Sequence, residues 1–430
     1  MNKEIKQRIE QLNNGKIPKG YQKTDFGVFP SDWETDKTLG DLFDFYGGLS
    51  KSRDELGEEG YAYLHYGDLH RGTFNSASID QYEQLPKCDI SLTGKEMCLM
   101  KDGDVAFLDA SEDLEGTSRA VLIDNPENKP FIAGLHIIYG KAKNNNLDKW
   151  FKQYITSSES VKKQFQRLAV GFKVYGVNRD TISRIKVAFP SSQKEQSRIA
   201  DILMKWDEAI ELYDKQIDAL TRYKAVCLKK MFPIKGQSVP EWRFQGFSGD
   251  WEQRKLGDVV QITMGQSPDG STYSDEPSDY ILVQGNADLQ NGWVCPRIWT
   301  TQITKKADAG DLIMSVRAPA GAMGKTAYNA VIGRGVAAIK GNEFIYQLLV
   351  KMDMDGFWKT LSCGSTFESL NSDNIKNAEV KVPTTAEQVQ IGDFFRQLDN
   401  LITLHQRKKE VITSQRKTLQ QYLLNGIIRV

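Results

Sequence analysis

Two glycine-rich stretches contain the residue types that hold phosphates or dinucleotides in other proteins. Residues 333–338 fit the loose form of a dinucleotide-binding fingerprint, but no convincing helix or ribose-binding acid follows them. Residues 319–326 end in Gly-Lys-Thr, as a phosphate-binding loop does. There, however, Pro319 stands where the first glycine belongs, and proline has no amide hydrogen to donate. We therefore reject both stretches as nucleotide sites.

The remaining reactive side chains form no catalytic pattern. The histidines His65, His70, His136 and His405 lack metal-ligand spacing, and the first two are expected to be surface or structural residues. The 5 cysteines are scattered, without the close pairs of metal sites or disulfide frameworks. No two prolines are adjacent, whereas an amino-group DNA methyltransferase needs such a pair in its target loop. We expect no catalytic, cofactor-binding or metal site, and activity of the purified chain alone would favour the alternative of an unrecognised enzyme.

Binding to nucleic acid is the chemistry that the sequence does offer. Between Lys149 and Lys186 lysine and arginine are opposed only by Glu159 and Asp180, an excess that suits phosphates. At its centre, residues 171–179 form a glycine-bounded loop with cationic, aromatic and amide groups, the types that contact base edges. A solvated helix face followed by a hairpin is the alternative. The candidate nucleic-acid contacts are Lys162, Lys163, Arg167, Lys173, Tyr175, Asn178 and Arg179 in the first half, and Arg297, Lys305, Lys306, Arg317, Lys325 and Arg334 in the second.

Two long helices are predicted to position these candidates. From Lys194 to Met231 apolar residues recur at alternating spacings of four and three, which defines a heptad seam whose one gap is filled by Lys224. The same seam recurs 192 residues further along, where His405, Lys409 and Arg416 are polar intrusions. The seam includes Ile199, Leu203, Trp206 and Ile210 in the first helix, and Ile391, Phe395, Leu398 and Ile402 in the second.

The charges along the two predicted helices favour an antiparallel pair. Each helix is acidic near its start and basic near its end, which suits the helix dipole. In an antiparallel pair the acidic start of one helix lies along the basic end of the other, whereas a parallel pair would set like charges together. We therefore predict an antiparallel coiled coil. The alternative is two amphipathic helices that each pack on their own globular domain.

The duplication extends beyond the helices. An Asp-Trp-Glu motif followed by Leu-Gly-Asp occurs within residues 32–41 and again within 250–258, and residues 171–178 resemble 364–371. Short β-branched and aromatic runs separated by glycine and proline predict strands in both halves. The predicted fold class is therefore α+β, with two similar mixed α/β domains separated by the two helices and an internal pseudo-twofold repeat.

Length and composition limit the protein class. A chain of 430 residues is too long for one ordinary core. The formal net charge is +0, which argues against a generally polycationic nucleic-acid binder, so binding must depend on local patches. Residues 1–10 lack the apolar core of a signal peptide, and no later run approaches a membrane-spanning length. We expect a cytoplasmic protein without a membrane partner.

These repeated motifs resemble the specificity (S) subunit of type I restriction-modification systems. Besides the two Asp-Trp-Glu openings, the helix entries share a proline, a glutamine and an isoleucine, at residues 190–199 and 383–391, although the spacing to the glutamine differs by one. Residues 315–319 and 333–335 also look like recurring features of such second halves. The resemblance covers nearly the whole chain from about Gly20 onward.

The resemblance implies a non-catalytic subunit that reads DNA. Two target recognition domains would each read one half of a bipartite site in double-stranded DNA, while the helices set the spacing and dock two methyltransferase (M) subunits. S-adenosylmethionine, ATP and Mg would act through partner subunits, and restriction (R) subunits would complete a complex with type I endonuclease and adenine-N6 methyltransferase activity. A two-domain coiled-coil scaffold that binds proteins is the rival. Salt-dependent duplex binding that needs both halves would distinguish the two.

The expected domain boundaries follow from the same resemblance. They are an N-terminal helical extension (1–20), a first target recognition domain (21–192), a first conserved helix (193–233), a second target recognition domain (234–384) and a second conserved helix (385–430). The role of the extension is not implied by the resemblance.

Overall fold

The computed structural model describes residues 3–70, 85–89, 99–113, 116–143, 147–171, 175–362 and 369–430. The chain forms two compact units. Unit 1 comprises Met1–Leu212 with Lys409–Val430, and unit 2 comprises Tyr213–Lys408. Each unit therefore contains part of both long helices, whereas the predicted boundaries set the helices apart from the domains. Among the described residues, no helix is both long and apolar enough to cross a membrane.

Unit 1 is built on two sheets. An antiparallel sheet has the strand order β4-β11-β7-β9, and a second sheet has the order β10-β5-β6, in which β5 and β10 are parallel. These strands are β4 (Phe43–Gly47), β5 (Tyr61–Leu64), β6 (Lys87–Cys88), β7 (Val105–Leu108), β9 (Ala120–Leu122), β10 (Phe131–Ala133) and β11 (Ile137–Ala142). Short pairs are β1 (Tyr21–Lys23) with β2 (Val28–Pro30), β3 (Trp33–Glu34) with β13 (Phe189–Pro190), and β8 (Ala110–Ser111) with β12 (Tyr175–Gly176).

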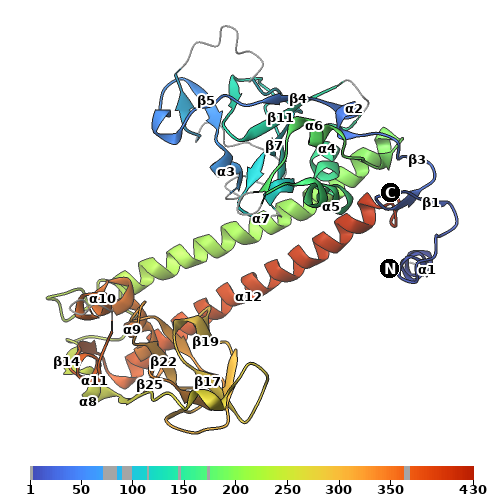
Figure 1. The fold of residues 1–430 in the computed structure, drawn as a ribbon. Helices are drawn as coiled ribbons and strands as arrows, with labels where there is room; N and C mark the ends of the chain where they lie inside the picture. Colours follow the sequence, from blue (N-terminus) through green and yellow to red (C-terminus); the bar gives the residue numbers. More distant parts are fainter. Residues whose placement is uncertain are drawn as a thin grey trace. The chain divides into compact units, whose positions relative to one another are not determined.

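Helices cover one face of the four-stranded sheet of unit 1. These helices are α4 (Lys149–Thr156), α5 (Glu159–Leu168), the start of α7 (Gln193–Lys230) and the end of α12 (Thr385–Leu424) (Figure 1). Phe107, Phe151 and Phe165 are buried at this interface, and burying each such ring contributes about 1.5–3 kcal/mol. The opposite face packs on the second sheet through Leu64 and Leu108. The remaining helices are α1 (Lys3–Asn13), α2 (Leu39–Leu42), α3 (Tyr66–His70) and α6 (Arg179–Ser183).

Unit 2 repeats this plan with larger sheets. Their strand orders are β15-β25-β22-β23-β19-β18 and β16-β20-β17-β24-β21. The strands are β15 (Gln261–Met264), β16 (Tyr273–Ser274), β17 (Tyr280–Val283), β18 (Leu289–Gln290), β19 (Trp293–Val294), β20 (Ile298–Thr300), β21 (Lys306–Ala307), β22 (Leu312–Ser315), β23 (Met323–Lys325), β24 (Ala330–Ile332) and β25 (Val336–Lys340). A further pair joins β14 (Glu252–Lys255) to β26 (Glu379–Val382), and the helices are α8 (Leu256–Val259), α9 (Glu343–Met354), α10 (Phe357–Ser362) and α11 (Ser372–Lys376).

The strand registers of the two units are equivalent. In unit 1, Ile137 at the start of β11 lies opposite Leu108 at the end of β7. In unit 2, Val336 at the start of β25 lies opposite Ser315 at the end of β22. The parallel pair of β5 and β10 in unit 1 has its counterpart in β17 and β24 of unit 2. The predicted α+β fold with an internal repeat is thus confirmed.

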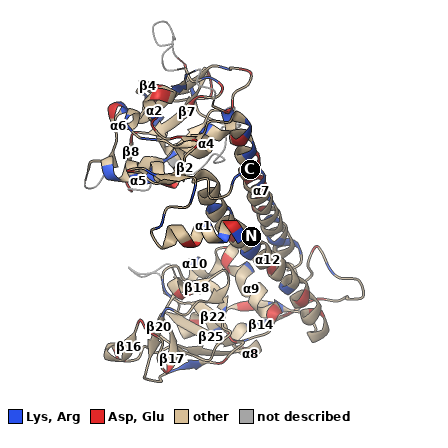
Figure 2. Ribbon diagram, turned by 90° about the vertical axis from the view of Figure 1, so that its right-hand side faces the viewer, with Lys and Arg blue, Asp and Glu red and all other residues tan. Residues whose placement is uncertain are grey.

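The long helices run antiparallel within each unit. In unit 2 the Tyr213 ring lies 5.6 Å from the His405 ring, and the Lys224 ammonium lies 2.6 Å from the carboxylate of Asp399. As the residue number rises along α7, that of its partner on α12 falls. The helix α7 begins at Gln193 and ends at Lys230, within one residue of the predicted bounds. Both signs of charge occur along α7 and α12 (Figure 2).

Interhelical ion pairs occupy the polar positions of the seam. In unit 1 the Arg416 guanidinium lies 2.8 Å from the carboxylate of Asp207, and this pair is equivalent to the pair of Lys224 with Asp399 in unit 2. The Tyr154 hydroxyl donates to Asp207 at 2.9 Å, and burial together with that carboxylate raises the pKa of Tyr154, so the phenol remains a donor. The seam residues Ile199, Leu203, Ile391, Phe395 and Leu398 are buried, whereas Trp206, Ile210 and Ile402 are half-buried.

An arginine holds the first turn of each long helix. In unit 1, Arg429 lies 2.5 Å from Glu195 and 2.9 Å from Asp32. In unit 2, Arg243 lies 2.8 Å from Glu387. Glu195 and Glu387 stand at equivalent positions of the duplication, but the two arginines do not. The chain that leaves one helix therefore ties itself to the start of the other by a device that each half supplies independently.

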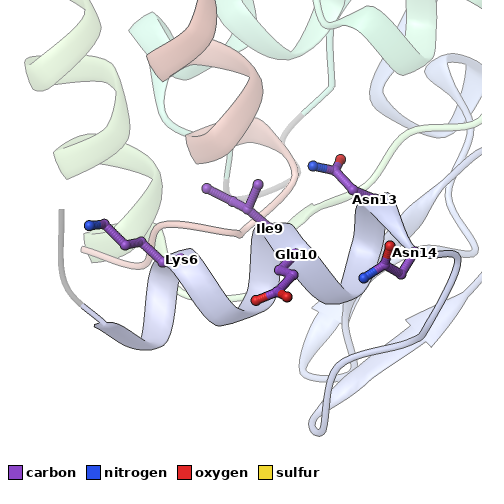
Figure 3. Close-up of a pocket in the computed structure, with 5 residues that line it drawn as sticks. All are labelled: Lys6, Ile9, Glu10, Asn13 and Asn14. Carbon is purple, nitrogen blue, oxygen red and sulfur yellow. The ribbon is translucent and has the colours of Figure 1, made fainter.

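The N-terminal helix of unit 1 contacts the C-terminal segment. The Arg8 guanidinium on α1 donates to the Ile427 carbonyl at 3.1 Å, and the Tyr21 hydroxyl donates to the Gly426 carbonyl at 2.6 Å. An open hollow of about 470 Å³ lies along α1 and its final turn. Its lining, drawn in Figure 3, is Lys6, Ile9, Glu10, Asn13 and Asn14. The helix α1 buries no residue fully, so its contacts are made by partly exposed side chains such as Arg8.

Candidate nucleic-acid interface

In each unit, several loops meet where the parallel strands end. In unit 1 they are residues 48–51 after β4, 65–68 after β5 and 134–136 between β10 and β11, together with Asp109 after β7. We call this set loop edge 1. In unit 2 the counterparts are residues 265–267, 284–286, 333–335 and 316–317. This second set is loop edge 2.

Glycines allow the loops of both edges to touch backbone to backbone. A Cβ atom on Gly48 would lie 1.9 Å from the carbonyl oxygen of Gly134, and one on Gly265 would lie 2.1 Å from that of Gly333. At loop edge 2, a Cβ on Gly335 would lie 2.0 Å from the Gln284 carbonyl oxygen. Any side chain at these positions would displace the backbone. The glycines therefore fix the loops as a closely packed platform.

Loop edge 1 presents an aromatic cluster and a carboxylate. The Tyr66 ring lies 5.4 Å from the His136 ring, edge to face, and 4.6 Å from the His65 ring. The His136 Nδ1 lies 3.0 Å from the Asp109 Oδ1. The side chains of His136 and Asp109 are 46% and 33% exposed, and Tyr66 is 38% exposed, so all three remain accessible.

The backbone of His136 is unusual for a residue with a side chain. Its φ of +60° lies in the left-handed region that favours glycine. Such strain persists where the surrounding structure holds it, and it occurs disproportionately at functional sites. Here the His136 carbonyl accepts from the Asp109 backbone N–H at 3.2 Å, which helps to hold the turn.

A buried tyrosine holds the loops of edge 1 together. The hydroxyl of Tyr63, a fully buried residue of β5, donates to the Leu49 carbonyl at 2.6 Å. It accepts from the backbone N–H groups of Lys51 at 3.1 Å and Leu135 at 2.8 Å. Burial raises the pKa of Tyr63, so the phenol stays protonated and keeps all three bonds. One side chain thereby positions the loops on either side of it.

Loop edge 2 presents donors instead of an aromatic cluster. The exposed Arg334 is held at its backbone, whose N–H donates to the Ser267 hydroxyl at 3.1 Å. Exposed Gln266 and Lys305 flank the same turn, because their backbones pair with Ile332 at the end of β24. Arginine, lysine and glutamine can all donate hydrogen bonds from this surface.

A buried carboxylate holds the loops of edge 2 together, as Tyr63 holds those of edge 1. Asp288, which is 2% exposed, accepts from the backbone N–H groups of Gln284 at 2.7 Å and Gly285 at 3.2 Å. It also accepts from Nε of Arg297 at 3.0 Å. The residue at the Tyr63 position of unit 2 is Leu282, which has no hydroxyl. The two edges thus use different side chains to stabilise the same backbone arrangement.

Of the first-half candidates, Tyr175 lies near loop edge 1, Asn178 and Arg179 lie at the start of α6, and three lie on α5. Tyr175 pairs with Ser111, two residues from Asp109, and Asn178 caps α6 by accepting from the Thr181 N–H at 2.8 Å. Arg179 is exposed at the start of α6. On α5, Lys162 is half-buried, Lys163 is exposed and lies 3.7 Å from Glu159, and Arg167 is exposed. Lys173 lies outside the described residues.

Lys149 and Lys186, at the two ends of the basic stretch, form ion pairs with acids from elsewhere in the chain. The Lys149 ammonium lies 2.7 Å from Asp102 and 2.6 Å from Asp124, while that of Lys186 lies 2.9 Å from Asp25. None of these acids belongs to the stretch, so a count of local charge could not include them. The cations that remain for phosphates are fewer than the sequence indicated.

The second-half candidates divide into two groups. Lys305, Lys306, Arg317 and Arg334 are exposed, and Arg317 bridges to Ser369 through its backbone. Arg297 is paired with Asp288, as described above. Lys325 is 13% exposed and lies 3.0 Å from Glu343, with its ammonium 4.5 Å from the centre of the Tyr346 ring. The Lys325 side chain is therefore held inside unit 2.

The predictions from the sequence did not include Tyr66, Asp109 or Gln284. They named His136 only as a residue that lacks metal-ligand spacing. A signal did exist, because Gly134 and Gly333 begin equivalent turns. The turn at 333–335 joins β24 to β25, and residues 319–326 run from the connection after β22 through β23. Neither stretch leads into a helix, as both nucleotide-binding motifs require. Within the described part of the chain, no cluster of three or more metal-ligating side chains occurs.

Related sequences show the same duplication or extend over nearly the whole chain. The type I restriction modification DNA specificity domain matches residues 30–222 and again 248–414. In Methanocaldococcus jannaschii, the MjaX specificity subunit of a type I restriction enzyme is 25% identical over 95% of this chain and 97% of its own. The MjaVIII specificity subunit of the same organism is 23% identical over 93% of this chain and 94% of its own.

Solved structures show the same fold. The type I restriction-modification S subunit from M. genitalium superposes with a TM-score of 0.60 at 17% identity, over 91% of this chain and 96% of that chain. A chain from a study of complex assembly in the type I restriction-modification system has a TM-score of 0.56 at 19% identity, over 93% and 99%.

The chain belongs to the type I restriction-modification DNA specificity family, because the family model matches both of its halves. It is a DNA sequence-specificity subunit, as the repeated motifs predicted. The rival reading of a protein-binding scaffold is not favoured.

Proposed function

We propose that each unit reads one half of a bipartite site in duplex DNA through its loop edge. The supporting observation is that two backbone arrangements stabilised by equivalent glycine contacts present different exposed side chains, aromatic and acidic at edge 1 and cationic at edge 2. A common backbone with different side chains is what two readers of different sequences require, because direct readout depends on the donors and acceptors at the base edges.

The chemistry is assigned to partner subunits. Two methyltransferase subunits dock on the paired helices, which also set the spacing between the half-sites, and restriction subunits complete the complex. S-adenosylmethionine, ATP and Mg act in those partners, and this chain contributes no catalytic group. A methyl-transfer assay with labelled cofactor should give no turnover with this chain alone and turnover once methyltransferase subunits are added.

An exchange of one unit tests the assignment of half-sites. Residues 21–189 are replaced by the equivalent segment of a relative, and the methylated sequences of host DNA are then determined. One half of the recognised sequence should change while the other half persists. A change in both halves would contradict the model of two independent readers.

A further inference from the structure

The two loop edges differ in hydrogen-bond polarity, and we infer that they select bases of opposite polarity. Edge 1 recognises a base with an exocyclic amino group in the major groove, either adenine N6 or cytosine N4, through Asp109 and His136. Edge 2 recognises guanine through Arg334. This inference rests on the proposed function, since it concerns which bases the two readers take.

At edge 1 the pair of Asp109 and His136 presents hydrogen-bond acceptors. A carboxylate only accepts hydrogen bonds, and its 3.0 Å contact with Nδ1 of the imidazole places the ring proton on that nitrogen. In the neutral ring Nε2 then carries a lone pair, so both groups offer acceptors to a ligand. The exocyclic amino groups of adenine and cytosine are the donors that the major groove provides.

The ring of Tyr66 limits how a base can approach this pair. It meets the His136 ring edge to face at 5.4 Å, and it stays 38% exposed. Together with the strained φ of His136 and the three hydrogen bonds of Tyr63, this contact fixes the imidazole before DNA arrives. A preorganised acceptor discriminates better than a mobile one, because less ordering accompanies binding.

At edge 2 the hydrogen-bond polarity is reversed. The guanidinium of Arg334 has donors only, and its fork matches the O6 and N7 acceptors of guanine. The Arg334 backbone N–H donates to the Ser267 hydroxyl at 3.1 Å, and its Nε donates to the same oxygen at 3.4 Å, so Ser267 positions both the turn and the base of the guanidinium. No carboxylate lies within ion-pair distance of Arg334 among the pairs in the described residues, unlike Arg297, which Asp288 holds.

The experiment removes single base atoms and single side chains in combination. The full chain is assembled with its methyltransferase subunits and bound to duplexes that contain the sequence methylated in the host. In half-site 1, each adenine is replaced in turn by purine and each cytosine by its analogue without the N4 amino group. In half-site 2, each guanine is replaced in turn by 7-deazaguanine. One position in each half should lose about 5- to 150-fold in affinity, equivalent to about 1–3 kcal/mol.

The protein variants then identify the partner of the missing base atom. Asp109→Ala keeps the backbone bonds of residue 109, and His136→Gly suits the left-handed φ, so neither should unfold the loop. In these variants the removal of the amino group should cost no further affinity. Arg334→Ala should likewise abolish the penalty of 7-deazaguanine. His136→Asn, which also tolerates this φ, is the second variant for edge 1.

Matched controls lie at the opposite ends of the same strands. Glu127 is paired with Lys129 just before β10 begins, and Lys340, paired with Asp308, ends β25. Glu127→Gln and Lys340→Ala should keep both penalties at their wild-type size.

The outcomes separate this inference from the proposed function. If affinity depends on both half-sites but the base-analogue penalties persist in the Asp109, His136 and Arg334 variants, the polarity assignment is overturned and the two-reader model stands. If affinity does not depend on the half-site sequences at all, both fail. Adenine and cytosine are distinguished by which substituted position carries the penalty.

Discussion

Loop edge 1 and loop edge 2 have the same backbone hydrogen bonds but almost no side chain in common. At edge 1 the Gly134 N–H donates to the Leu64 carbonyl, and at edge 2 the Gly333 N–H donates to the Val283 carbonyl. The turns that follow differ in character, because His136 stands in one where Gly335 stands in the other. The comparison shows that the structural requirement lies in the backbone, while the exposed positions are free to differ. That separation allows one fold to specify two sequences.

The buried residues that support the edges differ as well. Edge 1 depends on a neutral phenol, Tyr63, and edge 2 on a carboxylate, Asp288. Each satisfies backbone N–H groups that would otherwise be unpaired, which costs about 1–3 kcal/mol for a buried donor. The duplication has therefore preserved the positions of the loops without preserving the groups that hold them.

The largest expected effect concerns the spacing that the two long helices set between the half-sites. A heptad inserted near Asp214 in α7 and another near Gln406 in α12 keep both seams in phase and add roughly 10 Å at about 1.5 Å per residue. Since DNA rises about 3.4 Å per base pair, the unspecified gap in the methylated sequence should lengthen by about three base pairs. Both half-sequences should persist. Methylome sequencing measures this, and an unchanged gap would show that the helices do not set the spacing.

The next test concerns the glycine contacts. Gly48→Ala places a Cβ 1.9 Å from one backbone oxygen, and Gly335→Ala places one 2.0 Å from another. Each should destabilise its unit by about 3 kcal/mol, the upper range for overpacking. Each should also impair reading of only its own half-site. Gly47→Ala and Gly285→Ala are the controls, because nothing lies within 4 Å of a Cβ there. Denaturant unfolding and half-site binding would measure both effects, and equal losses in the controls would refute the packing argument.

A third test compares the equivalent ion pairs of the seam. Arg416→Met in unit 1 and Lys224→Met in unit 2 each leave a poorly exposed carboxylate without its cation. Each should lower the free energy of unfolding by about 1.5–3 kcal/mol, the range for hydrogen bonds to charged groups. Restoring neutrality with Asp207→Asn in the Arg416 variant should recover part of the loss. Additive losses in this double variant would mean that the two side chains are not coupled.

A smaller effect is expected from the support of edge 1. Tyr63→Phe removes one hydroxyl and leaves the N–H groups of Lys51 and Leu135 without their acceptor. The unfolding free energy should fall by about 1–2 kcal/mol. Discrimination against single-base changes should fall in the first half-site only. Tyr46→Phe, on the neighbouring β4, is the control, and a loss of discrimination in both halves would argue against a local role.

The smallest effect is expected from a phosphate contact. Arg179→Ala removes an exposed cation at the start of α6 and should weaken binding to all duplexes alike, by under about 1 kcal/mol at moderate salt. The slope of log affinity against log salt should decrease by about one. Arg184, which is paired with Asp180 on the same surface, supplies the control Arg184→Ala. A change at a single base position would instead make Arg179 a base reader.

The helices and the repeat could be predicted from the sequence because each depends on local spacing. The heptad spacing and the charges predicted the bounds of α7 and its antiparallel pairing with α12. The loop edges depend on register instead. Asp109 contacts His136 only because β7 pairs with β11, and the Lys186 ammonium is paired with Asp25, which is far away in the sequence. Contacts of that kind follow from strand pairing, which no local pattern specifies.

The ion pairs of the seam also bear on inheritance. Asp207 belongs to one repeat and its cation Arg416 to the other, and the same is true of Asp399 and Lys224. Recombination that replaces one repeat with that of a relative therefore brings in one acid and one base, each of which must find its complement in the resident repeat. Domains on either side of the helices can diverge freely, but these four positions act as a compatibility requirement between halves of different ancestry.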